Sequence, residues 1–362
     1  MQAQQQHIRG IDSVRFVAAL WVAFGHGASL PLKQLFAHTG TLGQILAAAN
    51  GVTFCGPAAV TVFFVISGLC IHLPYVGAQR MPVGEFYVRR YVRIGGPLLI
   101  VLLLTQLFPT PAGAAKQVLW SVYCELAYYT AYPLLFAWIR KGALTKVIVL
   151  STVAAIALIC VHWSYLREWE FGALTFIVGY PAWLLGCLLA EHVSKADVPQ
   201  LKQSVWWWRG AAWVYTVGAM LLVYHSPLKV GYPMTMLPFS FFCFYWLRGE
   251  LARWKLRSPF EWLEWAGKWS FSLYLMHKIV ITQIADAPPN LPVLAIWLLQ
   301  LAGILGLSYL FFLLVERPCH RAARRWGRAV RQLALPAAGH SGFLRSLSKL
   351  VADALRRDPK TE

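Results

Sequence analysis

The stretch "IDSVRFVAALWVAFGH", from Ile11 to His26, decides the fold of this chain. Its apolar residues have the length and hydrophobicity of a helix that enters a lipid bilayer. Three ionisable residues stand among them, namely Asp12, Arg15 and His26. Ionisable groups within a membrane-spanning helix are costly and usually face a cavity or one another, so each of the three is a candidate functional residue.

The composition indicates an integral membrane protein. Of the 362 residues, 58% are hydrophobic and only 13% are charged, and the mean hydropathy is +0.53. Basic residues between apolar segments orient a membrane protein, so the net charge of +18 does not lead us to expect a nucleic-acid partner. The seven cysteines lack the spacing of a zinc site or a disulfide framework, and we expect no metal.

Ten apolar segments approach the length needed to cross a bilayer, which predicts an all-α bundle of about ten transmembrane helices. They cover residues 11–30, 52–73, 95–108, 118–139, 146–163, 171–190, 205–224, 233–247, 269–285 and 292–315. Most Lys and Arg residues of the connecting loops fall on the side of the N-terminus, whereas Lys33, Lys116, Arg167 and Lys229 fall on the other. By the positive-inside rule, both termini are therefore cytoplasmic.

The chain is expected to divide into two parts. A transmembrane domain covers residues 8–325 and embeds the protein in the lipid bilayer. Residues 326–362 are rich in Lys and Arg. They are expected to form a basic amphipathic or disordered cytoplasmic tail against anionic headgroups.

Arg15 and His26 lie on one face of the first helix. They are eleven residues apart, which places them about 20° apart around the axis and about 16 Å apart along it. Asp12 precedes Arg15 by three residues, close enough to pair with it. In one interpretation Arg15 and His26 border a polar passage; in the other Arg15 extends to the headgroups and His26 bonds a neighbouring helix.

Glu125, in "LWSVYCELAYYTAYPLL", enters the membrane to a depth near that of His26. A carboxylate beside an imidazole fixes its tautomer and raises its basicity, which suits general-base catalysis. The other interpretation of Glu125 is a hydrogen bond between packed helices. Ser67 and Gly68, in "FFVISGLCIHLPY", are small residues that permit helices to approach closely.

The segment "EFYVRRYVRIGGPLL" places Arg89, Arg90 and Arg93 just before the third span. Such a group can anchor lipid phosphates, or it can hold the phosphates of a nucleotide-bearing donor, because guanidinium groups bind phosphate bidentately. His277 and Lys278 fall near the middle of the ninth span. At least one of these two is expected to line a cavity.

Together these motifs resemble the acyltransferase 3 family of multi-pass membrane acyltransferases. The likeness covers the chain up to Arg325 and rests on six stretches in the family's order: "IDSVRFVAALWVAFGH", "FFVISG", "FYVRRYVRI", "LWSVYCELAYYTAYPLL", "SFSLYLMHK" and "LSYLFFLLVERPCHR". The resemblance implies a multi-pass O-acyltransferase of the inner membrane. It would move an acetyl group from cytoplasmic acetyl-CoA to a hydroxyl of a cell-surface polysaccharide or its lipid-linked precursor.

The positions of the polar residues suggest a role for each of them in acyl transfer. The hypothesis assigns catalysis to His26, Glu125 and Arg15, donor binding to Arg90, Arg93 and Ser67, and contact with the acceptor to His277 and Asp12. In it, Glu125 orients His26, which acts as a base or becomes acylated. A transporter or flippase of a lipid-linked saccharide is the alternative function, because it would line its pathway with the same intramembrane polar residues. A non-catalytic membrane assembly partner is the third.

Overall fold

The computed structural model describes residues 8–36, 38–108, 116–162, 174–194, 204–228, 230–285 and 291–333. Within these residues the chain is helical and contains no strand. The expected all-α fold class is therefore confirmed. The last part of the predicted tail, residues 334–362, lies outside the described residues.

The helices in chain order are α1 (Ile11–Ala23), α2 (Leu32–Leu35), α3 (Thr41–Thr53), α4 (Gly56–His72), α5 (Val83–Leu107), α6 (Lys116–Ile139), α7 (Leu144–Val161), α8 (Thr175–Ser194), α9 (Val205–His225), α10 (Tyr232–Leu256), α11 (Glu261–Gly267), α12 (Ser270–Ala285), α13 (Val293–Phe311) and α14 (Arg317–Leu333). A π-helical turn, Phe24–Ala28, extends α1. A second one, Phe312–Glu316, joins α13 to α14. α14 thus continues beyond residue 325, where the tail was expected to start.

Each of the ten expected segments overlaps a helix, but several helices are longer than the apolar run. α5 begins at Val83, so the three arginines expected before the third span lie on the helix itself. An ion pair between Glu85 and Arg89, one turn apart, stabilises the polar first turns of α5. The sequence did not predict α3 and α11, which have 13 and 7 residues, because both are too short to register as spans.

Among the residues that the structure describes, five stretches are long and apolar enough to cross a membrane: Thr41–Tyr75, Val83–Leu107, Leu144–Val161, Thr175–Ser194 and Val293–Leu333. Large apolar side chains point outward from the bundle, with Leu107, Leu134 and Val161 each more than 70% exposed. In water such a surface would be unfavourable, whereas in a bilayer it contacts lipid tails. The fold is therefore that of a membrane protein.

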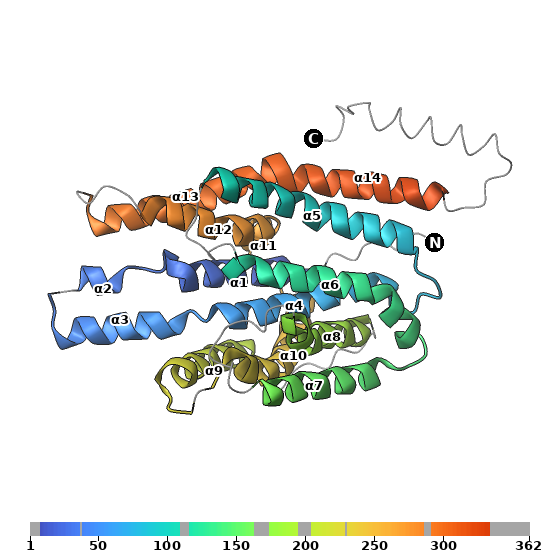
Figure 1. Ribbon diagram of the computed structural model, residues 1–362, viewed down its shortest axis with the longest axis horizontal. Coiled ribbons are helices and arrows are strands. Elements are labelled where there is room, and N and C mark those ends of the chain that lie inside the picture. Colours follow the sequence, from blue (N-terminus) through green and yellow to red (C-terminus); the bar gives the residue numbers. More distant parts are fainter. Residues whose placement is uncertain are drawn as a thin grey trace.

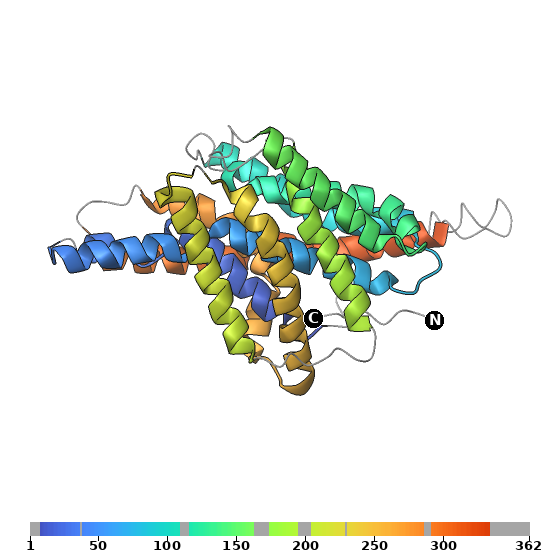
Figure 2. The ribbon, with the colours of Figure 1, turned by 90° about the horizontal axis from the view of Figure 1, so that it is seen from below.

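α4 is the central helix of the bundle. It packs against α1 on one side and against α8 and α10 on the other, and Figure 1 shows it between these elements. Figure 2 shows α9 and α10 side by side, inclined to the long direction along which α3 and α4 run. α5 and α14, far apart in the sequence, lie alongside each other at the top of Figure 1.

The tightest contact joins α4 to α8. A Cβ added to Gly68 would lie 1.9 Å from the carbonyl oxygen of Trp183, and one added to Gly186 would lie 2.0 Å from that of Val65. The two backbones therefore touch, as the small residues of the "FFVISG" motif predicted. Close approach of this kind brings residues of α8 within hydrogen-bond reach of α4.

Substitution of Gly186 by Ala should lower the thermal unfolding temperature. The added Cβ would meet the backbone of α4, and overpacking of this kind costs about 1–3 kcal/mol. Gly218→Ala is the matched control, because a Cβ at Gly218 meets nothing within 4 Å and alanine is the better helix former. Thermal unfolding in detergent should rank Gly218→Ala at or above the wild type and Gly186→Ala below it; equal values for the two variants would contradict the close contact.

Candidate active site

A polar cavity of about 100 Å³ lies among α1, α4, α5, α6 and α12. Its charged lining consists of four cations, Arg15, Arg90, Arg93 and Lys268, and two carboxylates, Glu125 and Glu316. The space is sufficient for several water molecules or a slender part of a ligand. The excess of cations suits an anionic ligand. Within the described part of the chain, no three His, Cys, Asp or Glu side chains are grouped so that they could hold a metal ion.

α1 contributes Arg15 to the cavity. The Nη1 atom of Arg15 lies 3.5 Å from Oδ1 of Asp12, so the expected pair is present. The cavity lining includes Arg15 but not Asp12. The backbone of Asp12 packs against Gly267, where a Cβ would come within 2.1 Å of the Asp12 carbonyl oxygen. Asp12 thus contacts a cavity residue, Arg15, without lining the cavity itself. Its contact with an acceptor stays a prediction.

The three arginines of α5 divide into two groups. Arg90 and Arg93 line the cavity from one side of the helix. Arg89 instead pairs with Glu85, with 2.5 Å between Nη2 and Oε1, and packs against Gly327 of α14. The buried Nε of Arg90 has no hydrogen-bond partner in the described residues. Buried donors are normally satisfied, so this N–H is available to a ligand.

Glu316 is a cavity residue that the sequence analysis did not single out. It ends the second π-helical turn and is only 2% exposed. Its Oε2 accepts hydrogen bonds from the backbone N–H of Ser272, at 3.1 Å, and from the Ser272 hydroxyl, at 2.5 Å. In the sequence, Glu316 stands out as a lone carboxylate at the end of a long apolar run. A carboxylate in such a place needs hydrogen-bond donors when it is buried.

Ser67 and Glu125 meet at the cavity wall. The Ser67 hydroxyl donates to Oε1 of Glu125 over 2.5 Å, and the Tyr129 hydroxyl donates to the same oxygen. The indole N–H of Trp183 donates to Ser67 Oγ over 3.2 Å. One carboxylate therefore satisfies two hydroxyls, and the network ties α4, α6 and α8 together around the cavity.

His26 contacts His277 and not Glu125. Nδ1 of His26 lies 3.0 Å from Nε2 of His277, and the two rings stack with their centroids 5.2 Å apart. The expected contact between Glu125 and His26 is not formed in the described residues, because Glu125 turns toward Ser67 of α4. Equal depth in the bilayer was the basis of that expectation, and depth does not determine which neighbour a helix faces. The partner that orients His26 is the second histidine.

The local sequence around His26 explains how its ring reaches α12. Glycines flank it within the first π-helical turn. Gly27 has a φ of 113°, which side chains of L-residues rarely adopt. A Cβ at Gly25 would come within 2.7 Å of the Phe54 carbonyl oxygen, so glycine permits this approach. Single π-helical turns of this kind are frequent at functional sites.

The hydrogen bonds determine which nitrogen of each neutral imidazole carries the proton. Nδ1 of His277 lies 3.2 Å from the carbonyl oxygen of Leu273, which can only accept, so this nitrogen carries the proton. Nε2 of a neutral His277 is then an acceptor, and Nδ1 of His26 donates to it. This leaves Nε2 of His26 with a lone pair and no proton. A nitrogen in that state can accept a proton.

The polar cavity and the histidine pair lie at two levels of the bundle. Arg15 and His26 are about 16 Å apart along α1 at the usual helical rise. Tyr274 connects the levels, because it lines the cavity and its ring centroid lies 6.0 Å from that of His277. Its hydroxyl lies 2.6 Å from Oγ of Ser121, another cavity residue. Four cations therefore line the cavity at one level, and the two imidazoles lie at the other, where Lys278 follows His277 in the chain.

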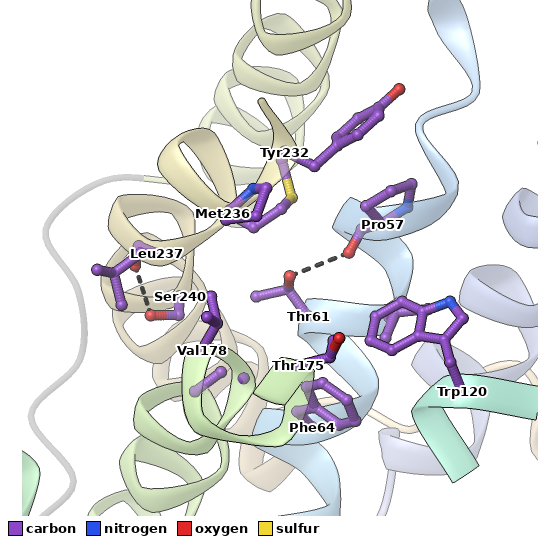
Figure 3. A pocket seen from close by; sticks show the side chains of 14 residues that line it. Pro57, Thr61, Phe64, Trp120, Thr175, Val178, Tyr232, Met236, Leu237 and Ser240 are labelled. Atoms are coloured by element: carbon purple, nitrogen blue, oxygen red, sulfur yellow. Dashed lines mark hydrogen bonds between the residues drawn. The ribbon is translucent and has the colours of Figure 1, made fainter. Parts of the chain in front are cut away.

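A second cavity, of about 60 Å³, borders the first. It lies among α4, α6, α8 and α10, and it shares Val60 and Phe64 with the polar cavity. Figure 3 shows Phe64, Trp120 and Met236 around this space. Its walls are mainly aliphatic and aromatic, so its chemistry differs from that of the arginine-lined cavity.

Comparison with known proteins identifies the kind of chemistry. A family model described as an acyltransferase domain matches residues 8–316. The chain is also similar to the acyltransferase MdmB of Streptomyces mycarofaciens, with 26% identity over 316 residues that cover 75% of this chain and 78% of the relative. No solved structure matches the chain.

Replacement of Glu125 by Leu should destabilise the fold more than replacement by Gln. Leucine removes the oxygen that accepts from both Ser67 and Tyr129, and their mutual contact at 3.0 Å can satisfy only one of the two donors. The other is left unsatisfied, which costs about 1–3 kcal/mol for a buried polar group. The amide oxygen of Gln still accepts one hydrogen bond. Thermal unfolding in detergent should therefore give the order wild type, Gln variant, Leu variant, whereas a Leu variant as stable as the wild type would show that the network contributes nothing.

Proposed function

We infer that this chain, which belongs to the acyltransferase 3 family, is an O-acyltransferase that moves an acetyl group from acetyl-CoA to a hydroxyl group of a saccharide. The acceptor is a cell-surface polysaccharide or its lipid-linked precursor. The observation that carries this proposal is the contact of His26 Nδ1 with His277 Nε2, which leaves Nε2 of His26 as a proton acceptor about 16 Å along α1 from a cluster of cations.

The donor fits the arginine-lined cavity. Acetyl-CoA carries phosphates at one end and its thioester at the other, joined by a long and slender pantetheine arm. Arg90 and Arg93 would bind the phosphates through charge-assisted hydrogen bonds. Ser67, Glu125 and Arg15 line the space through which the arm would pass. The distance from Arg15 to His26 allows the extended arm to bring the thioester to the level of the histidine pair.

His26 would act on the acceptor. Its Nε2 takes the proton of the saccharide hydroxyl, and the oxygen attacks the thioester carbonyl carbon. As the carbon–sulfur bond breaks, the imidazolium returns the proton to the departing thiolate. His277 keeps the ring of His26 in the required tautomer and accepts a hydrogen bond from the imidazolium that forms. Glu125, in place of orienting His26, would hold Ser67 and Tyr129 at the donor site.

The chain would cross the inner membrane ten times with both termini in the cytoplasm. The distribution of Lys and Arg between the loops supports this arrangement. It places the level of Arg90 and Arg93 toward the cytoplasm, where acetyl-CoA is found, and the histidine pair toward the outer side. A transporter of lipid-linked saccharides would have no use for a CoA thioester, so consumption of acetyl-CoA distinguishes the two functions.

Replacement of His26 by Ala should lower the rate of acetyl transfer by a factor of about 10²–10⁴, the usual contribution of a general base. The measurement follows radiolabelled acetyl-CoA into the glycan fraction of membranes that contain each variant at equal amounts. Monodisperse behaviour in detergent controls for misfolding. A His26→Ala enzyme that keeps a substantial rate would exclude His26 as the base.

Replacement of Arg90 and Arg93 by Ala should weaken acetyl-CoA binding. Each charge-assisted hydrogen bond contributes about 1.5–3 kcal/mol, so the dissociation constant should rise more than tenfold for each arginine. Arg89→Ala is the matched control, because Arg89 pairs with Glu85 and does not line the cavity. Calorimetric titration should show near wild-type affinity for Arg89→Ala; if the double variant also keeps that affinity, the two residues are not part of the donor site.

A further inference from the structure

The second cavity offers a site of a different chemistry from the first. It lies toward the beginning of α4, where Pro57 and Thr61 form part of its wall. Figure 3 shows Thr175 and Val178 of α8 and Tyr232, Met236 and Ser240 of α10 around the same space. None of the site residues expected from the sequence lines this cavity, so its role is separate from theirs.

The hydroxyl groups in this wall already have partners within the protein. Thr61 donates to the carbonyl oxygen of Pro57 over 3.0 Å, and Ser240 donates to that of Leu237 over 2.6 Å, as the dashed lines in Figure 3 show. The Tyr232 hydroxyl lies 3.0 Å from the sulfur of Met220. The protons of these three hydroxyls are used within the protein, so they could only accept hydrogen bonds from a saccharide, whose buried oxygens also need donors. An aliphatic chain has no such requirement.

The two cavities follow each other along α4. Cys70 and Ser67 line the polar cavity, Phe64 and Val60 line both cavities, and Pro57 lines the apolar one. From Cys70 to Pro57 this path is about 20 Å long at the helical rise. A donor held by Arg90 and Arg93 would therefore direct its thioester end toward the wall that the two cavities share.

We propose that the apolar cavity behind Phe64 receives the aliphatic part of acyl groups longer than acetyl, so that the donors include short-chain acyl-CoA thioesters. This inference rests on the proposed function and specifies its donor. A volume of about 60 Å³ accommodates roughly four to six water-sized groups. The site therefore takes a chain of a few carbon atoms and not a fatty acyl chain.

Calorimetric titration of the purified full-length protein in detergent tests the proposal without an identified acceptor. The probes are acetyl-CoA, butyryl-CoA, hexanoyl-CoA and decanoyl-CoA. Each buried methylene should tighten binding roughly fourfold, so butyryl-CoA should bind about 15-fold more tightly than acetyl-CoA. Decanoyl-CoA should gain nothing over hexanoyl-CoA, because the cavity is full.

Two substitutions that fill the apolar cavity should remove the preference for butyryl-CoA over acetyl-CoA. Val178→Phe and Ser240→Leu add bulk from α8 and α10, so the ratio of the acetyl-CoA to the butyryl-CoA dissociation constant should fall from about 15 to near 1. Val214→Phe is the matched control, because Val214 is 63% exposed on α9 and lines neither cavity. It should keep the wild-type ratio, and unfolding temperatures should confirm that all variants are folded.

The outcomes separate this inference from the proposed function. If acetyl-CoA binds but the wild type shows no preference for butyryl-CoA, or the filling variants keep the preference, the chain does not occupy this cavity and the inference is overturned. The proposed acetyl transfer then stands. If no CoA thioester binds, the proposed donor is wrong as well.

Discussion

The helices α4 and α8 approach so closely at Gly68 and Gly186 that no side chain fits between them. This contact determines the rest of the site. It brings the indole N–H of Trp183 within 3.2 Å of Ser67 Oγ, and Ser67 in turn bonds Glu125 of α6. Since a bilayer offers no water to replace lost partners, a polar network of this kind requires helices at fixed separations. The same stretch of α4 presents Phe64, the wall that the two cavities share.

The sequence predicted features that depend on spacing within one helix. It predicted the contact of Asp12 with Arg15 because three residues make one helical turn, and it predicted the close approach at Gly68 from the size of the residue. It did not predict the partner of His26, because helical periodicity describes one helix and says nothing about its rotation against the next. Glu125 and His277 were both at suitable depths, and only the packing of α1 on α12 chose between them. Glu316 was overlooked because its partner, Ser272, lies 44 residues away.

The arginines of the polar cavity and the histidine pair lie apart along the bundle. Arg15, Arg90 and Arg93 lie around one end of α1, whereas the two imidazoles lie beyond Tyr274. A guanidinium next to an imidazole would disfavour protonation of the imidazole through electrostatic repulsion. The distance of the two imidazoles from the three arginines weakens that repulsion, and in the proposed function an elongated donor would span it. In the proposed function, the phosphates of the donor and the proton acceptor would therefore occupy different levels of the bundle.

Glu85 of α5 contacts its own helix through one carboxylate oxygen and α14 through the other. Oε1 pairs with Arg89 of α5 at 2.5 Å, and Oε2 lies 3.5 Å from Nη1 of Arg331 of α14. α14 therefore packs against the part of α5 that leads to Arg90 and Arg93. If the proposed donor binds Arg90 and Arg93, this packing would hold its phosphates at a fixed position relative to both helices.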